Sequence, residues 1–420
     1  MGNQTIYTEL FLSGLSDLPA LQLPLFLFFL LIYLLTLIGN FLIISLIVTD
    51  SHLHVPMYFF LGNLAGLDLC CSSVTAPQML FDLRTRRRMR TVTACPGAPG
   101  QWKCPQNGPI LENKHPNPEF ILLGLSDLAN FQIPVFLMLI LIYLATLAGN
   151  FLIIFLVAID SHLQTPMYIF LGNLSVLDIS TPSVSGCHLY FDTITGNNLV
   201  AYSTCIAQAF FFSLLASTEY FLLAVMSYDR YVAICHPLHY ATIMSNTKCV
   251  QLASSAWAMG SIFSLVHTLS ILRLAYCDST TISGFFCELY QLILLSCSDT
   301  SLNNLLIYTV GLISALTAFL ITFLSYVYIL KNILRIKINH GRQKAFSTGS
   351  SHLTVVLMYY STTIFNYIQP KPKNALVSRL VSIIYTFFTP FLNPLIYSLR
   401  NTELRTAVFR ALVRVAKTIK

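Results

Sequence analysis

Long apolar runs separated by short polar connections extend along most of the chain. A bilayer core about 30 Å thick is crossed by roughly 20 apolar residues in a helix, so each run of this length predicts a membrane-spanning helix. Nine such runs are present, at residues 24–48, 57–80, 134–158, 167–190, 205–232, 250–272, 305–329, 351–368 and 380–399. The first run lacks the basic flank of a secretory leader and is interpreted as a retained span. The pattern predicts an all-α membrane protein.

The first two runs repeat the polar positions of the third and fourth. GLSDL at 14–18 recurs at 124–128, GNFLII at 39–44 recurs at 149–154, and PMY at 56–58 recurs at 166–168, with an offset of about 110 residues that holds as far as Cys95 and Cys205. Independent hydrophobic helices do not share polar residues in register, so the repeat predicts a partial duplication. Three regions are expected: a first copy at 1–95 with two spans and the start of a third, a Pro/Gly-rich linker at 96–118, and a seven-span domain at 119–420.

Charge is sparse and gathers beside the spans. Charged residues make up 10% of the chain and the net charge is +7, against about 25% charged residues in a soluble domain, which argues against nucleic-acid binding. Basic residues follow the seventh and ninth runs, so the positive-inside rule predicts a cytoplasmic C-terminus and an extracellular N-terminus. The sequon at Asn3 then lies on the correct side for glycosylation. The Arg cluster at 84–90 conflicts with this orientation of the first hairpin.

Four long motifs occur in order within the seven-span domain. They are PMY at 166–168, MSYDRYVAIC at 226–235, KAFST at 344–348 with SHL at 351–353, and PFLNPLIY at 390–397. Together they resemble the odorant receptors, a family of rhodopsin-like G-protein-coupled receptors, over about residues 118–420. The resemblance implies a seven-helix bundle in the plasma membrane that is not an enzyme. It also implies a small volatile ligand and a stimulatory, olfactory-type G protein that raises cAMP.

Two of these motifs are implied to control activation. Arg230 at the end of a span is costly unless it is paired, and neighbouring Asp229 can hold it. The resemblance implies that Asp229, Arg230 and Tyr231 open toward the G protein; a static interfacial anchor is the alternative. Pro394 after Asn393 removes a backbone hydrogen bond and predicts a kink, with Tyr397 one turn below. A purely structural kink is the alternative there.

Three polar side chains, Asn150, Asp178 and Glu219, stand deep in apolar runs. Ionisable groups inside a membrane usually face the bundle interior and mark function. Two nearby carboxylates do not both ionise without a cation, so a sodium ion or a shared proton is hypothesised between Asp178 and Glu219, similar to the family's ion pocket. Two neutral acids with hydrogen-bonded neighbours are the alternative.

The chain has eleven cysteines, an odd number. The resemblance implies bridges from Cys205 to Cys287 and from Cys277 to Cys297, which would close a loop over the bundle. Cys187, Cys235 and Cys249 are expected to be free thiols. Gly284 stands where the family often has a His, so no copper dependence is expected and no metal other than sodium.

A pocket for a small apolar ligand should be aromatic and aliphatic with a few hydroxyl groups. The family pocket mapped onto this chain comprises Phe212, Ser213, Ala216, Ser217, Val310, Ser314, Tyr360, Thr363, Ile364, Tyr367, Ile383 and Thr386. Spacings of three and four place each set on one helical face, although aromatic stripes more often serve packing. Phe212 occupies the place where an amine receptor has its acid, which favours neutral volatiles.

Two other interpretations remain open at this stage. Tandem repeats also occur in transporters and channels, but there a repeat normally covers half of the protein. The joined chain is alternatively a non-functional fusion of a broken gene copy to an intact neighbour, or an incorrect gene model.

Overall fold

The fold is known from a computed structural model, which describes residues 119–124, 132–195, 198–276, 281–282, 284–335, 352–362, 375–400 and 403–410, with residues 33, 34, 38 and 40 of the first run. The predicted regions 1–95 and 96–118 otherwise lie outside the described residues. The same holds for the predicted site residues Asn3, Cys277, Thr363, Ile364 and Tyr367.

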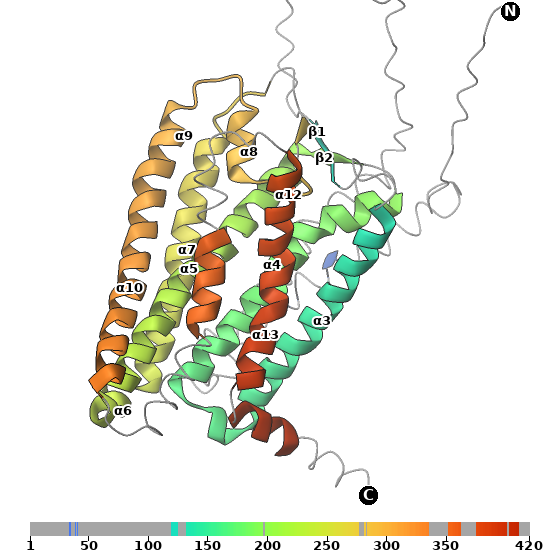
Figure 1. The fold of residues 1–420 in the computed structure, drawn as a ribbon. Helices are drawn as coiled ribbons and strands as arrows, with labels where there is room; N and C mark the ends of the chain where they lie inside the picture. Colours follow the sequence, from blue (N-terminus) through green and yellow to red (C-terminus); the bar gives the residue numbers. More distant parts are fainter. Residues whose placement is uncertain are drawn as a thin grey trace, which may run out of the picture.

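Long helices stand side by side and form a bundle (Figure 1). They are α3 (Gln132–Ile159), α4 (Pro166–Thr195), α5 (Tyr202–Cys235), α7 (Asn246–Ile271), α10 (Leu312–Arg335) and α13 (Thr389–Arg400). A π-helical turn, Ile307–Gly311, joins short α9 (Ser301–Leu306) to α10, and a second one, Ile384–Phe388, joins α12 (Ala375–Ile383) to α13. Residues 352–362 and 403–410 are also helical. The connections hold two more short helices, α6 (Tyr240–Ile243) and α8 (Leu289–Leu294).

Five helical stretches within the described residues are long and apolar enough to span a membrane. They are Gln132–Ile159, Tyr202–Cys235, Asn246–Ile271, Ser301–Arg335 and Arg379–Tyr397. The predicted runs at 167–190 and 351–368 are represented by α4 and by helical residues 352–362. The described residues therefore support a helical membrane protein. They leave the predicted seven-span count and the extra hairpin as proposals.

Helix α4 carries buried polar residues and is surrounded by other helices. It packs against α3, α5, α7 and α13, and Asn173, Asp178 and His188 on it are buried. The indole N–H of Trp257 on α7 donates to Oδ1 of Asn173 at 3.1 Å. Polar groups away from water need partners within the protein, and a helix surrounded by helices can supply and receive them.

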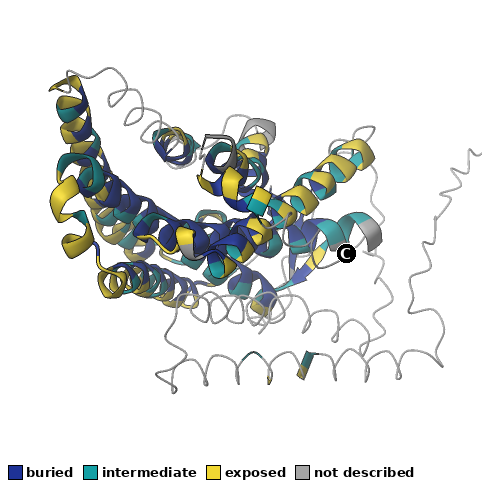
Figure 2. Cartoon of the chain, turned by 90° about the horizontal axis from the view of Figure 1, so that it is seen from below, coloured by how far each residue is buried: buried dark blue, intermediate teal, exposed yellow. Residues whose placement is uncertain are grey.

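The outer surface of the bundle is apolar. Buried residues line the middle of the bundle and exposed residues its outer faces (Figure 2). Leu141 on α3 is 67% exposed and Leu334 on α10 is 71% exposed. Exposed apolar surface on this scale is rare in soluble monomers and is expected of helices that face lipid.

Three short strands form a sheet at one end of the bundle, which is named here the sheet end. They are β1 (Glu119–Leu122), β2 (Leu199–Ala201) and β3 (Thr281–Ile282), in the order β2-β1-β3. The central strand β1 is antiparallel to β2 and parallel to β3. The side chains of Phe120 and Leu122 are fully buried in a second apolar cluster beneath the sheet. The opposite end of the bundle carries Arg230 and is named the Arg230 end.

Gly260 permits the close approach of α7 to α5. A Cβ atom at this position would lie 2.2 Å from Oγ1 and 2.9 Å from the backbone N of Thr218. Small residues at helix contacts allow membrane helices to pack closely. Because the backbone of α5 cannot move aside freely, this contact fixes the distance between the two helices.

We predict that Gly260→Ala lowers the free energy of unfolding by about 1–3 kcal/mol through overpacking. This loss of stability is measured as a decrease in the thermal unfolding temperature of the detergent-solubilised protein. Gly311→Ala is the matched control, since the nearest atom to its Cβ is 4.0 Å away. An unfolding temperature of Gly260→Ala equal to that of Gly311→Ala would contradict the proposed close contact.

Candidate functional site

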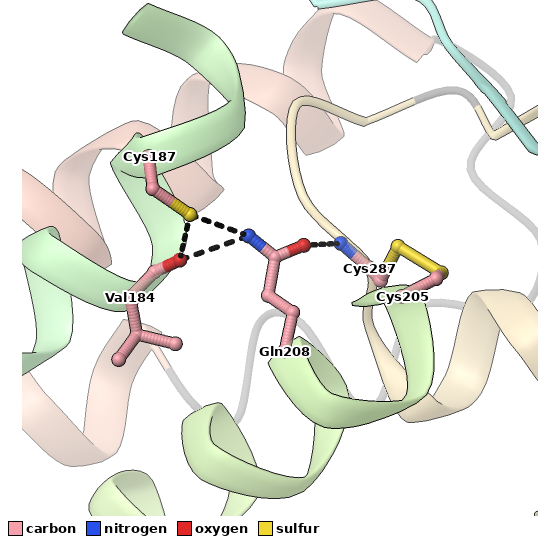
Figure 3. Close-up of a disulfide and its surroundings, with 5 residues drawn as sticks. All are labelled: Val184, Cys187, Cys205, Gln208 and Cys287. Atoms are coloured by element: carbon pink, nitrogen blue, oxygen red, sulfur yellow. Dashed lines mark hydrogen bonds between the residues drawn. A yellow bond between two sulfur atoms is a disulfide. The ribbon is translucent and has the colours of Figure 1, made fainter. Parts of the chain in front are cut away.

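A disulfide bond closes the loop between α7 and α9 over the sheet end (Figure 3). It joins Cys205, at the start of α5, to Cys287, with 5.4 Å between the Cα atoms. This is the first of the two bridges implied by the family motifs. Cys297 is also disulfide-bonded, and its expected partner Cys277 lies outside the described residues. Cys235 and Cys249 are free thiols, as predicted, and Cys187 is outside the disulfide bonds of the described residues.

Gln208 ties this loop to α4 by both ends of its amide (Figure 3). Its Nε2 donates to the carbonyl of Val184 at 2.8 Å, and its Oε1 accepts from the backbone N–H of Cys287 at 2.8 Å. Cys187 also donates to the carbonyl of Val184, at 3.1 Å. Gln208 is fully buried, so the amide and the neighbouring disulfide together fix the height of the loop above the bundle.

A chain of aromatic rings runs from this loop into the bundle. Phe286 lies 4.5 Å from Phe212 of α5, and Phe212 lies 5.9 Å from Tyr385 in the π-helical turn. Tyr385 lies 5.7 Å from Tyr359, and Tyr360 follows in the same helix. These ring-centroid distances are those of attractive aromatic pairs. The result is a buried apolar cluster contributed by a loop and by three helical segments.

The predicted pocket residues fall into two groups. Phe212 and Tyr360 belong to the aromatic chain. Ile383 and Thr386 are buried and lie close to Tyr385 in the sequence. The backbone carbonyl of Ala216 accepts a hydrogen bond from the Tyr359 hydroxyl at 2.6 Å. Ser213 is buried and Ser217 half-buried on the same helix. The hydroxyl of Ser314 donates hydrogen bonds to the backbone carbonyls of Val310 and Gly311. The side chain of Val310 is 38% exposed.

The predicted ion-site residues lie buried where α3, α4, α5 and α13 pack. Nδ2 of Asn393 donates to Oδ1 of Asp178 at 2.8 Å, and Nδ2 of Asn150 donates to the carbonyls of Thr146 and Pro390 at 3.0 and 3.3 Å. Glu219 is near enough for its charge to act on Asp178.

Three buried oxygen atoms in this group have no hydrogen-bond partner among the described residues. They are Oδ1 of Asn150, Oε1 of Glu219 and Oδ1 of Asn393. Buried polar atoms normally have a partner. Oxygen atoms of amides and carboxylates are the ligands that hard cations prefer. Asn150, Glu219 and Asn393 thus offer oxygen donors of the type that a sodium ion accepts.

The Arg230 end contains an ion pair held by a third residue. Arg230 donates through Nε to Asp229 at 3.0 Å and also through Nη2, and both residues are buried. The hydroxyl of Tyr240 on α6 donates to the other carboxylate oxygen of Asp229 at 2.8 Å. Burial first, and the charge of Asp229 second, raise the pKa of Tyr240, which keeps it protonated as the donor. The predicted latch is thus a three-residue cluster.

The other predicted residues of the Arg230 end make separate contacts. Tyr231 pairs with His236 at 3.1 Å, and Tyr397 is buried with its hydroxyl unpartnered among the described residues. The ring of Pro394 packs against Gly149 of α3. A Cβ atom added at Gly149 would lie 3.1 Å from the proline ring. Pro394 therefore lies against α3.

The helix at 403–410 is fastened beneath α3 and α4. Arg410 donates to Asp160 through Nε at 2.9 Å and Nη2 at 2.6 Å, and Tyr168 donates to Glu403 at 2.9 Å. Burial alone would raise the pKa of Asp160, but the hydrogen bonds and charge of Arg410 outweigh it and lower the pKa. Leu404 and Ala407 are buried on the same helix.

Gln291 fills the space beside Gly284. A Cβ at Gly284 would lie 3.1 Å from Nε2 and 3.3 Å from Oε1 of Gln291. Burial raises the pKa of Glu288 to about 7, and a hydrogen bond with Gln291 opposes this shift. The imidazole of a histidine at position 284 would therefore displace the Gln291 side chain. The glycine at this position leaves room for Gln291.

Several of these residues were missed by sequence reasoning. Tyr240, Phe286 and Tyr385 carry no pattern that distinguishes them from packing residues. Gln208 had a usable signal, because it is a lone amide in the apolar run at 205–232, the same argument that selected Asn150 and Asp178.

The overall fold is that of a rhodopsin-like membrane receptor. Squid rhodopsin has a similar crystal structure, with a TM-score of 0.50 and 16% sequence identity over 67% of this chain and 85% of that protein. At this level of identity the likeness concerns the fold alone.

The sequence comparisons then give the family. The family model described as "Olfactory receptor" matches residues 29–96 and 139–415. Human olfactory receptor 10C1 is 47% identical over 70% of this chain and 95% of its own length. Human olfactory receptor 1J1 is 44% identical over 72% of this chain and 94% of its own length. The dog olfactory receptor-like protein OLF4 is 42% identical over 71% of this chain and 97% of its own length. The chain belongs to the olfactory receptor family, whose members are non-enzymatic G-protein-coupled receptors, and this does not favour a transporter.

We predict that Gln208→Met lowers the free energy of unfolding by about 1–3 kcal/mol, because the N–H of Cys287 is left buried without an acceptor. Gln208→Glu should lower the unfolding temperature further, because a carboxylate would face the carbonyl of Val184. The control is Gln251→Met, since Gln251 is exposed on α7. Equal unfolding temperatures for Gln208→Met and Gln251→Met would show that the hydrogen bonds of Gln208 do not stabilise the protein.

Proposed function

We propose that this receptor binds small, mostly neutral volatile molecules within the bundle and activates a stimulatory, olfactory-type G protein, which raises cAMP. The aromatic chain from Phe286 to Tyr360 is the observation that carries this proposal. Its rings supply an apolar lining, and the tethered loop covers it at the sheet end. Sites for small molecules are mostly apolar with a few polar groups, and Phe212 supplies no charge to hold an amine.

The Arg230 end has features that suit a protein partner. Leu238 is 94% exposed in the connection that follows α5. It lies two residues before Tyr240, which holds Asp229 in the ion pair with Arg230. A partner that covers Leu238 would bury apolar surface beside this cluster. Displacement of Tyr240 would then free Asp229 and Arg230 to exchange partners.

The membrane orientation is part of the proposal. Basic residues between α10 and the helix at 352–362, and after α13, favour a cytoplasmic position for the Arg230 end. The sheet end and the N-terminus then face the outside of the plasma membrane, where an oxidising environment permits the Cys205–Cys287 bond. Lipid surrounds the outward apolar faces of α3 and α10.

The function is tested by expressing the full chain with an olfactory-type G protein and measuring cAMP against panels of neutral volatiles, amines and acids. We expect a concentration-dependent rise with neutral volatiles. Arg230→Ala should abolish it, and Leu238→Asp should reduce the maximum at least tenfold at matched surface expression. His239→Asp is the control for Leu238→Asp, because His239 is exposed in the same connection. No rise from a surface-expressed chain, or an unchanged response in Arg230→Ala, would refute the proposal.

A sodium ion held by Asp178, Glu219, Asn150 and Asn393 would supply the positive charge that two buried carboxylates need. By holding α13 to α4 it would favour the resting state. We predict that replacing sodium with a large organic cation increases agonist potency about threefold or more in the parent. Asp178→Asn should lose most of this dependence. Equal sodium dependence in both proteins would exclude the ion site.

A further inference from the structure

Helix α4 carries a row of polar side chains on one helical face, which we call the α4 row. Successive members are separated alternately by three and four residues, a spacing that places side chains above one another on an α-helix. The members are Asp178, Thr181, Ser185, His188 and Asp192. The first four are buried, and Asp192 is half-buried. Polar groups therefore line this face of α4 over several turns.

The first member of the row faces the interior of the bundle. Asp178 accepts a hydrogen bond from Asn393 of α13, and Glu219 of α5 is near enough for its charge to act on Asp178. The row therefore begins between α13 and α5. From there it continues along α4 toward the sheet end, where β2 follows α4 in the chain.

Contacts on both flanks show where the middle of the row faces. On one flank, the carbonyl of Val184 accepts a hydrogen bond from Gln208 of α5 at 2.8 Å (Figure 3). On the other flank, a Cβ atom added at Gly186 would lie 3.1 Å from the ring of Phe387 in the π-helical turn. Ser185 stands between these two positions, so the middle of the row faces inward between α5 and the π-helical turn.

Helix α3 lies on the other side of α4. The hydroxyl of Ser183 pairs with that of Tyr143 on α3 at 2.9 Å, and the ring of Tyr190 lies 5.8 Å from that of Tyr143. These residues of α4 lie outside the spacing of the row. The row therefore faces away from α3.

The direction of the row leads to the aromatic cluster. Phe212 of α5 and Tyr385 of the π-helical turn belong to the two elements between which the row faces, and their rings lie 5.9 Å apart. Phe286 of the tethered loop lies 4.5 Å from Phe212. The α4 row is thus the polar border of a largely apolar cluster.

Four buried atoms of the row have no hydrogen-bond partner in the part of the chain that the structure describes. They are Oγ1 of Thr181, Nε2 of His188 and both carboxylate oxygens of Asp192. Ser185 differs, because its hydroxyl donates to the carbonyl of Thr181 at 2.8 Å. A buried polar atom without a partner is costly, so the row calls for a polar group from outside the chain.

We propose that His188 and Asp192 bind the hydroxyl group of the ligand, so that this receptor prefers alcohols among neutral volatiles. A hydroxyl group donates and accepts through one oxygen atom, so it can donate to Asp192 and pair with Nε2 of His188. The carbon chain would then lie against the aromatic cluster. This inference rests on the proposed function and names the ligand class of that site.

Two other ligand groups suit the row less well. An ether oxygen has no proton to donate and would leave the oxygens of Asp192 unpaired. Sites that hydrogen-bond a hydroxyl group discriminate strongly against analogues that lack it. An ammonium group would bring a charge next to Phe and Tyr rings, and burying a charge costs more than burying a hydroxyl group.

Matched probes test the inference on the full chain expressed with an olfactory-type G protein. The cAMP response is measured for straight-chain alcohols from hexanol to decanol, for their methyl ethers and for the corresponding amines. In the parent we expect the most potent alcohol to exceed its ether and its amine in potency by about tenfold or more. The ratio of ether to alcohol half-maximal concentrations is compared between proteins, because reduced expression affects both probes alike.

Variants assign this ratio to the row. His188→Leu and Asp192→Leu should each lower the ratio to about threefold or less, because the partner of the hydroxyl group is removed. Asp192→Asn should keep most of the preference, since its amide oxygen still accepts a hydrogen bond. Ser183→Ala is the matched control, because it removes a hydroxyl group from the α3 side of the same helix, and it should keep the parent ratio. The parent ratio decides the matter if the leucine variants do not fold.

Equal potency of alcohols and ethers in the parent would overturn the inference and leave water as the partner of these atoms. An unchanged ratio in both leucine variants would also overturn it. Amines that are more potent than alcohols in the parent, with this advantage lost in Asp192→Asn, would replace the hydroxyl group by an ammonium group.

Binding measured without the G protein separates this inference from the proposed function. The thermal unfolding temperature of the detergent-solubilised full chain is recorded with each alcohol and its ether. A larger rise with the alcohol that is lost in His188→Leu would support the site even if no volatile raised cAMP, in which case the proposed function alone would fail. A cAMP rise with other neutral volatiles, and neither response with alcohols, would overturn this inference alone.

Discussion

The hydrogen bond from Asn393 to Asp178 joins α13 to α4 at a depth where the membrane offers no alternative partner. A polar group in hydrocarbon must be satisfied within the protein, so this contact constrains every helix that touches either residue. Asn150 extends it to α3 through the carbonyl of Pro390. Pro394, the residue after Asn393, packs against Gly149 of α3. The lower half of α13 is therefore fixed by polar contacts and by close packing at the same level.

The two ends of the bundle differ in how their connecting segments are held in place. At the sheet end a disulfide, the amide of Gln208 and a three-stranded sheet hold the loop that contributes Phe286. At the Arg230 end a single residue, Tyr240, links the exposed connection to the ion pair. The first arrangement is suited to keeping an apolar lining closed. The second has one replaceable contact, as a switch requires.

Sequence reasoning predicted the polar residues of the bundle better than their partners. Asp178 stood out because a polar group in an apolar run demands an explanation, and Asp229 and Asn393 were selected by the family motifs that contain them. Their contacts with one another depend on helix packing, which a single sequence does not encode locally. The strands β1, β2 and β3 were missed because four, three and two residues are too few to show alternation. The mapped pocket residue Val310 lies in the π-helical turn at Ile307–Gly311, a change of helical spacing that the sequence pattern did not indicate.

We propose that a ligand near the sheet end changes the packing at the Arg230 end through this bundle. Distances between spin labels at Ile243→Cys on α6 and Lys331→Cys on α10, measured by double electron–electron resonance, report this change, because both positions are exposed. We expect that an odorant shifts the distance distribution in the parent protein, and that Gln208→Glu weakens the shift. Odorant binding that leaves the distribution unchanged would contradict it.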